Sequence, residues 1–168
     1  ALSAAAGSAS LWIRTSYDYT STEGIALYAT ADRGEGYGTD SEWHIGLNSS
    51  GRPQFFIRDS LVDQATATAA QSINDGRWHH VCATWRTGGM VSLYVDGVMA
   101  ATVTHPGFTT VYDAFAAFGR PHTVTQKHYR YFDGMLDNVC VDRGARSAEW
   151  IRVTYENQKE GSSFPTLR

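Results

Sequence analysis

The feature that most constrains this chain is a series of short β-rich runs separated by clusters of glycine, asparagine, aspartate and proline. About ten such runs can be read along the sequence, at residues 10–15, 24–30, 42–48, 53–59, 65–73, 78–85, 90–97, 98–104, 114–119 and 135–142. Turns such as Asp96-Gly97 supply residues that tolerate positive φ, which predicts antiparallel hairpins between neighbouring runs. The sequence therefore predicts an all-β sandwich of two antiparallel sheets.

Alternation of apolar and polar residues predicts which side chains face the core. In the run 90–97, Val91, Leu93 and Val95 occupy every second position and are expected to point inward. Tyr94 lies on the other face of that run and is expected to meet solvent.

The exception to the β pattern lies near the C-terminus. Ser147 can cap a short helix whose apolar side would consist of Trp150, Ile151, Val153 and Tyr155. We expect one to two helical turns there. Trp150 and Ile151 are expected to hold the helix against the sandwich.

Length, composition and charge limit the function classes. The 168 residues, 42% of them hydrophobic, are enough for one domain spanning residues 1–168. A formal charge of −3 provides no overall cationic field for binding nucleic acid. No apolar run approaches the roughly 20 residues that a membrane span needs, so membrane insertion is not expected.

The two cysteines, Cys82 and Cys140, are far apart in the sequence, and neither belongs to a metal-binding or redox pair. Both lie in predicted strands. Two interpretations remain open: a disulfide between strands, or two small buried thiols.

Three motifs carry a resemblance to a known family. The segment 75–81 (DGRWHHV), followed by 92–103 (SLYVDGVMAATV), resembles the central hairpin of laminin G-like and pentraxin-like domains of the concanavalin A-like superfamily. The segment 132–139 (FDGMLDNV) is similar to the closing strand of laminin G-like modules in bacterial cell-surface proteins. The resemblance covers most of residues 10–160. It implies a jelly roll that binds ligands on a concave sheet or on loops along one rim.

The resemblance also suggests where such a chain works. Related domains usually begin with an extra strand before the one similar to residues 10–15, and only a short stretch precedes it here. We therefore expect a module of a larger extracellular or cell-surface protein, whose other domains would be its neighbours.

Enzymatic activity is not expected. Glycanases of this superfamily use two glutamates on one strand, spaced so that both reach the same side, whereas Glu42 stands alone in its run. No Gly-x-Ser-x-Gly turn indicates a serine nucleophile. His79 and His80 belong to the family motif and are interpreted as structural.

Calcium is a possible cofactor because hard oxygen ligands recur on the loop rims of these folds. The resemblance points to Asp137, whose alternative role is to accept backbone hydrogen bonds. Asp32 and Asp40 flank a glycine-rich loop, and Asp40 falls near the position of a calcium aspartate in pentraxins. Pentraxins complete that site with an acidic cluster, but this chain has Arg-Pro-His-Thr at 120–123, so we expect the double-calcium site to be lost.

A basic and aromatic patch occupies the position of those acids. It consists of Arg120, His122, Lys127, His128, Tyr129, Arg130 and Tyr131. Cationic side chains can bind carboxylate or sulfate groups, and tyrosine rings can support a sugar ring. Other candidate platform residues are Tyr17, Tyr19, Tyr37, Trp43 and Tyr112.

These observations favour a non-catalytic carbohydrate-binding module that recognises a polysaccharide, with an acidic glycan as the ligand that the patch favours. The alternative is a protein-interaction or cell-adhesion module that uses the same rim. A glycanase with an unusual pair of acids is a third and weaker interpretation.

Overall fold

The computed structural model describes residues 5–19, 24–30, 42–58, 64–105, 115–119 and 131–161. Its strands are β1 (Ala6–Arg14), β2 (Gly24–Thr30), β3 (Glu42–Leu47), β4 (Pro53–Arg58), β5 (Gln64–Thr68), β6 (Trp78–Arg86), β7 (Gly89–Val95), β8 (Val98–His105), β9 (Phe115–Phe118) and β10 (Met135–Asp142). One helix, α1 (Ala148–Gln158), follows them.

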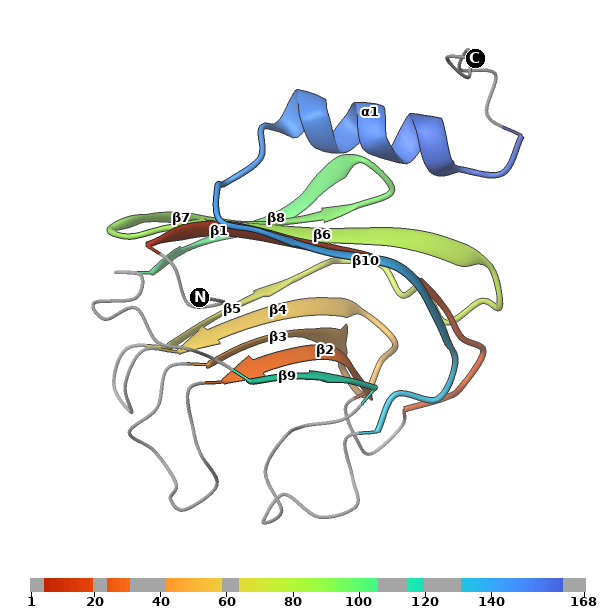
Figure 1. Cartoon of the computed structure of the whole chain (residues 1–168). Helices are drawn as coiled ribbons and strands as arrows, with labels where there is room; N and C mark the ends of the chain where they lie inside the picture. Colours follow the sequence, from red (N-terminus) through yellow and green to blue (C-terminus); the bar gives the residue numbers. More distant parts are fainter. Residues whose placement is uncertain are drawn as a thin grey trace.

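The strands form two stacked sheets. The first sheet has the order β10-β1-β6-β7-β8, and the second has the order β5-β4-β3-β2-β9. Neighbouring strands within each sheet pair antiparallel. Figure 1 shows the two layers, with α1 on the outer side of the first sheet. The predicted all-β jelly-roll sandwich is confirmed, and so is its C-terminal helical segment.

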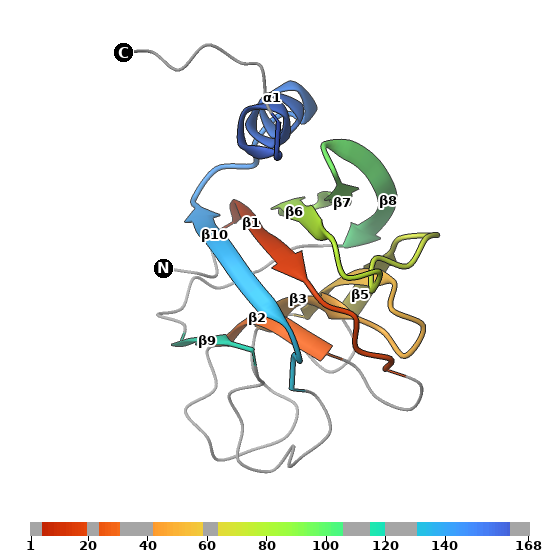
Figure 2. The ribbon, with the colours of Figure 1, turned by 90° about the vertical axis from the view of Figure 1, so that its right-hand side faces the viewer.

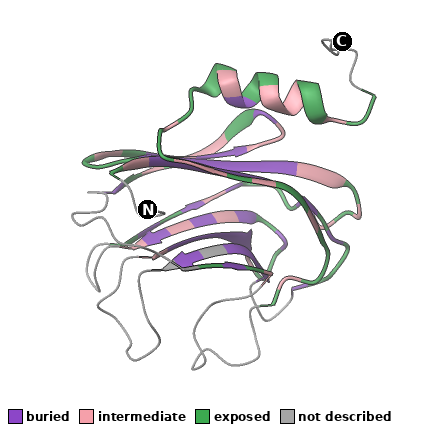
Figure 3. Ribbon diagram, in the orientation of Figure 1, coloured by how far each residue is buried: buried purple, intermediate pink, exposed green. Residues whose placement is uncertain are grey.

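The core fills the space between the two sheets. At its centre, the Trp43 ring lies 5.3 Å from the Trp85 ring, and Phe55 stacks on Trp85 at 5.6 Å. All three are buried. Figure 3 shows buried stretches in purple on strands of both sheets. The prediction of Trp43 as a surface platform for sugars is therefore wrong, because its position on β3 points its ring into the core.

Helix α1 covers the outer face of the first sheet, as the rotated view in Figure 2 shows. Ser147 is the N-cap, and its Oγ accepts a hydrogen bond from Trp150 N at 3.2 Å. Ile151 is fully buried and packs with Cys82 and Tyr94 of the sheet. The expected solvent exposure of Tyr94 is therefore wrong, since the helix covers it. The helix has eleven residues, about three turns, and is longer than predicted.

The cysteines lie on either side of β1. Ser10 of β1 pairs with Cys140 on one side and with Cys82 on the other. Two strand spacings amount to roughly 9–10 Å, more than the Cα separation that a disulfide spans. Both cysteines are free thiols, Cys82 buried and Cys140 exposed. The disulfide interpretation is therefore wrong for this structure, and Cys140 is not the buried thiol of the other interpretation.

Candidate functional site

The second sheet has an outer face, which is turned away from the first sheet (Figure 1). That face carries a strip of polar and aromatic side chains. On β3, Glu42 and His44 alternate with residues of the core, and on β4, Phe56 and Arg58 do the same. The register pairs Glu42 with Arg58 and His44 with Phe56, so the four side chains form two adjacent rows. We call these four residues the second-sheet strip.

The side chains of the strip contact one another directly. The His44 and Phe56 rings stack with centroids 4.9 Å apart and planes 19° apart. The Arg58 guanidinium lies 5.9 Å from the Phe56 centroid, and its Nη2 is 2.9 Å from Glu42 Oε1. The strip therefore joins an aromatic surface to an oriented cation, two features that sugar-binding faces combine.

Arg58 retains an unused hydrogen-bond donor. Its Nε is buried and has no partner among the described residues. A buried donor without an acceptor costs on the order of 1–3 kcal/mol, and more when the group is charged. Because guanidinium groups bind carboxylates through two parallel N–H groups, Arg58 is the residue of the strip best suited to an acidic group.

Polar side chains extend the strip to the edge of the sheet. Gln64 and Thr66 of β5 pair with Arg58 and Phe56, respectively, and both are exposed. Beyond Thr66, Gln54 Nε2 donates to Thr68 Oγ1 at 2.9 Å. Amide and hydroxyl groups of this kind can donate to and accept from sugar hydroxyls.

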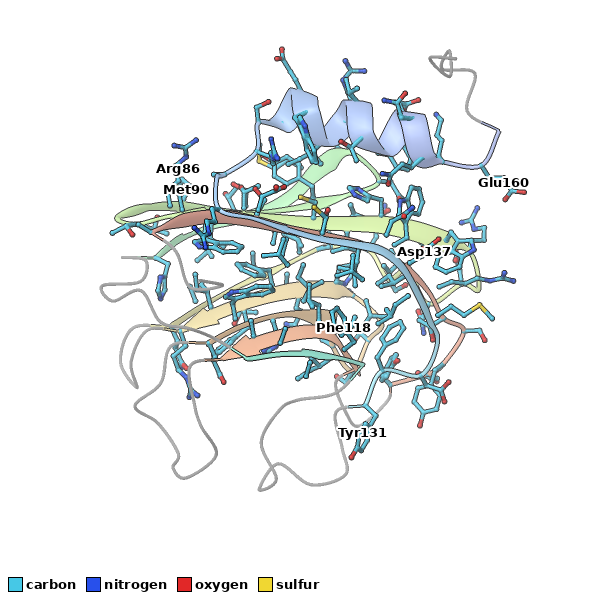
Figure 4. The ribbon with its side chains drawn as sticks, viewed as in Figure 1. Arg86, Met90, Phe118, Tyr131, Asp137 and Glu160 are labelled. Atoms are coloured by element: carbon cyan, nitrogen blue, oxygen red, sulfur yellow. The ribbon has the colours of Figure 1, made fainter. Side chains whose placement is uncertain are left out.

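Most of the predicted basic and aromatic patch lies outside the described residues: Arg120, His122, Lys127, His128, Tyr129 and Arg130. The residues that flank it are described. Phe132 N donates to Gly119 O at 2.9 Å, and Tyr131 forms a bridge with Ile25 of β2. Gly119 and Tyr131, the residues on either side of the segment 120–130, therefore lie at the β9 edge of the second sheet. Tyr131 is 55% exposed and projects away from the sandwich in Figure 4.

The acids predicted for calcium, Asp32 and Asp40, also lie outside the described residues, as do Tyr37 and Tyr112. Thr30 and Glu42 lie on either side of Asp32 and Asp40 in the sequence. They pair with each other at the end of the second sheet opposite Gly119. The second-sheet strip therefore begins at that end and extends toward the other, where Gly119 lies.

Asp137 lies on the other side of the molecule, on β10 of the first sheet, where it pairs with Trp12. Its Oδ1 accepts a hydrogen bond from Asn138 N at 2.7 Å, as the structural alternative predicts. Within the described ranges, no three His, Cys, Asp or Glu side chains are arranged to hold a metal ion. Calcium also takes backbone carbonyl, amide and water oxygens, so a calcium role for Asp137 stays a prediction.

The two remaining tyrosine candidates differ from each other. Tyr19 is buried, its Oη accepts a hydrogen bond from Asp133 N at 2.9 Å, and burial raises its pKa. Tyr17 is 47% exposed, meets the Tyr19 ring edge-on at 4.8 Å, and lines a pocket of about 500 Å³ with Asp18. Only Tyr17 of this pair can act as a surface platform.

Sequence reasoning missed the second-sheet strip, although a signal for it was present. Phe55 and Phe56 are adjacent on one strand, so only one of them can face the core. The outward ring, followed two residues later by Arg58, marks an aromatic and cationic face.

The fold defines a class: a two-sheet jelly roll with one covered outer face and one outer face that carries aromatic and charged side chains. A family model, the laminin G-like model described as the concanavalin A-like lectin/glucanases superfamily, matches residues 1–152. The chain therefore belongs to this family. No curated protein sequence matches it. Among the described residues, no helix is long and apolar enough to cross a membrane.

Solved structures share the fold at low sequence identity. The CBM40 module of a Ruminococcus gnavus sialidase, bound to α2,3-sialyllactose, matches with a TM-score of 0.71 and 15% identity over 92% of this chain and 84% of that one. A heptameric pentraxin from Limulus polyphemus matches with a TM-score of 0.68 and 14% identity, over 90% of this chain and 70% of that one. Domain 4 of an extracellular arabinanase from Geobacillus stearothermophilus was solved in complex with arabinotriose. It matches with a TM-score of 0.67 and 19% identity, over 90% of this chain and 66% of that one.

Proposed function

We propose that this chain is a non-catalytic carbohydrate-binding module that binds an acidic polysaccharide outside the cell. The second-sheet strip would contact the glycan, together with the β9 edge, where Gly119 and Tyr131 flank the segment 120–130. One observation carries the proposal: Arg58 holds an unpartnered buried donor beside the stacked rings of Phe56 and His44. That combination suits a sugar ring that bears a carboxylate.

The charges near the strip support an anionic ligand. Glu42 neutralises one edge of the Arg58 guanidinium and fixes its orientation at 2.9 Å. The segment 120–130, whose flanking residues Gly119 and Tyr131 lie at the β9 edge of the same sheet, adds Arg120, Lys127 and Arg130. Arginine binds carboxylates bidentately, whereas lysine acts as a point charge, so Arg58 would determine specificity and the lysine would add attraction.

Two of the structural neighbours support binding rather than hydrolysis. The sialidase module is bound to a sialylated sugar, which carries a carboxylate, and the arabinanase domain is bound to an uncharged trisaccharide. Glycoside hydrolysis needs two carboxyl groups across one bond. Among the described residues of the strip, Glu42 is the only carboxylate, and it pairs with Arg58.

Affinity electrophoresis through gels that contain polygalacturonate, alginate or a neutral glucan tests the proposal. We expect acidic polymers to retard the protein, and Arg58→Ala to weaken binding by about tenfold or more. Arg86→Ala is the matched control, because Arg86 is exposed at the end of β6 in the first sheet (Figure 4), whereas the strip lies on the second sheet. Arg120→Ala with Arg130→Ala tests the basic segment in the same assay.

Repeating the gels with calcium and with a chelator tests the calcium hypothesis for Asp32 and Asp40. Chelator-sensitive retardation would support a metal, and insensitive retardation would support the arginines alone. If no polymer retards the protein, the carbohydrate proposal is overturned and the protein-adhesion alternative takes its place. Melting temperatures of all variants show whether a loss of binding reflects a loss of folding.

A further inference from the structure

A second pocket lies on the opposite side of the molecule from the strip. It is a hollow of about 440 Å³ between the outer face of the first sheet and the C-terminal end of α1. Trp12, Arg14 and Trp78 of β1 and β6 line one side of it. Asp137 of β10 and Glu160, which follows α1, line other parts and lie on the same side of the molecule in Figure 4. We call this hollow the first-sheet pocket.

Contacts within the chain hold the helix side of the pocket in place. Trp12 Nε1 donates to Gln158 Oε1 at 2.7 Å, and the Trp12 ring stacks on Tyr155 at 5.8 Å. This hydrogen bond orients the Gln158 amide, whose nitrogen has no partner among the described residues. The pocket therefore has a fixed amide donor next to an indole.

The opposite wall is formed by a β-bulge. The pairing of β1 with β10 shifts between Ser10 and Trp12, which leaves Asn138 in a left-handed conformation with φ of 47°. Asparagine is one of the few non-glycine residues that adopt this conformation routinely, so the residue at 138 suits the bulge. The Asp137 carboxylate uses one oxygen for Asn138 N, at 2.7 Å, and the other oxygen has no partner among the described residues.

The groups of the pocket match an uncharged sugar. Asp137 and Glu160 give it two carboxylates against one guanidinium, and Arg14 already donates its Nε to Gly76 O at 2.7 Å. An anion would meet net repulsion there. Neighbouring sugar hydroxyls, in contrast, can donate to a carboxylate and accept from an amide, while the apolar face of the sugar packs on an indole such as Trp78.

We infer that the first-sheet pocket binds an uncharged sugar residue. The module would then have two carbohydrate sites on opposite faces, one for an acidic glycan and one for a neutral one. Two sites on opposite faces could hold separate chains of a mixed polysaccharide and raise the apparent affinity through multivalency.

The indole N–H signals of the five tryptophans provide a local readout by ¹H–¹⁵N NMR. We expect millimolar arabinotriose, xylotriose or cellotriose to shift the signals of Trp12 and Trp78, and the signals of the core residues Trp43 and Trp85 to stay in place. Trigalacturonate should not shift the first pair. Asp137→Ala and Gln158→Ala should each weaken the affinity for the neutral trisaccharides, measured from these shifts, by about tenfold.

Arg58→Ala separates this inference from the proposed function. It should leave the neutral-sugar shifts of Trp12 and Trp78 unchanged, whether or not the second-sheet strip binds an acidic glycan. If none of the three neutral trisaccharides shifts these signals, or if Asp137→Ala and Gln158→Ala respond as the wild type does, the inference is overturned. Retained dispersion of the NMR spectrum shows that the variants are folded.

Discussion

The carboxylate of Asp96 holds the imidazole of His79, with Asp96 Oδ2 2.8 Å from His79 Nδ1. Its other oxygen, Oδ1, accepts a hydrogen bond from His80 N at 2.9 Å. On the far side of the ring, His79 Nε2 lies 3.1 Å from Asp75 Oδ1. His79 therefore links the β7–β8 turn to the segment that precedes β6. This is a structural role for the histidine of the family motif, as the sequence predicts.

We predict that Asp96→Asn lowers the free energy of unfolding by about 1–3 kcal/mol near pH 6, because it removes a charge-assisted hydrogen bond to His79. Asparagine is chosen because Asp96 has a φ of 51°, which asparagine tolerates better than alanine. Urea denaturation measures the change. Asp142→Asn is the control, since Asp142 pairs with Arg146 at the surface, where such pairs contribute little. Equal losses in both variants would contradict the prediction.

The two carboxylates also predict a pH dependence. The hydrogen bond to Asp96, followed by the one to Asp75, raises the pKa of His79 above 6.5. Its protonation therefore stabilises the fold fully below pH 6.5, and this contribution is lost as the pH rises through the raised pKa. Stability curves measured from pH 7 upward, above the range in which His80 acts, should fall for the wild type. The decline should be weaker in Asp96→Asn, and an unchanged decline would show that another group is responsible.

His80 predicts the opposite dependence on the acid side. Its ring is buried next to the rings of Tyr155 and of Trp12, whose centroid is 5.4 Å away. The Nδ1 atom of His80 has no partner among the described residues, and burial lowers the pKa of the ring to about 4. The unfolded chain gains a proton near pH 6.5 that the folded chain excludes, so stability falls between pH 6.5 and 4 by up to roughly 3 kcal/mol.

His80→Phe should flatten the stability curve in that pH range, because phenylalanine keeps a ring against Trp12 but cannot take up a proton. Asp75 does not interfere, since Arg77 holds the pKa of its carboxyl below the usual value and its contribution is lost only at lower pH. If His80→Phe loses as much stability as the wild type between pH 6.5 and 4, another group takes up the proton.

Local patterns in the sequence were enough to predict the strands and their turns. Alternation around Leu93 and the Asp96-Gly97 turn, for example, indicate one β-hairpin without further information. Which side of a strand is covered depends on distant residues, and there the predictions failed. Tyr94 is buried because α1 packs over it. On β3 and β4, the register places Trp43 and Ile57 together on the core face, and His44 and Phe56 together on the outer face. A local signal marks only the Phe56 and Arg58 half of the strip. Its contacts with Glu42 and His44 depend on the pairing of β3 with β4, and the first-sheet pocket depends on several strands, which no local pattern encodes.

The packing of α1 gives a matched pair of variants. Ile151 is fully buried against Cys82 and Tyr94, whereas Val153, two positions later on the same helix, is 37% exposed. Ile151→Ala should lower the free energy of unfolding by about 2–4 kcal/mol, and Val153→Ala should change it by less than about 0.5 kcal/mol. Both substitutions replace a β-branched side chain with alanine, so the difference in helix propensity largely cancels. Similar effects on urea denaturation would place Ile151 outside the core.

The two thiols should react very differently with Ellman's reagent. Cys82 is fully buried, and burial raises the pKa of its thiol to about 12, so it should not react in the folded protein. Cys140 is exposed but only weakly activated, because partial burial and then Asp142 raise its pKa. One thiol per chain should therefore react in the folded protein, slowly at neutral pH and faster as the pH rises.

Unfolding without a reducing agent should release the second thiol, giving two per chain. A count of zero in the unfolded chain would reveal a disulfide and contradict the separation of Cys82 and Cys140 by β1. Ile151→Ala adds a test of the helix in the same experiment. Since Ile151 packs on Cys82, the smaller side chain should admit the reagent and speed the reaction of the second thiol, whereas Val153→Ala should leave its rate unchanged.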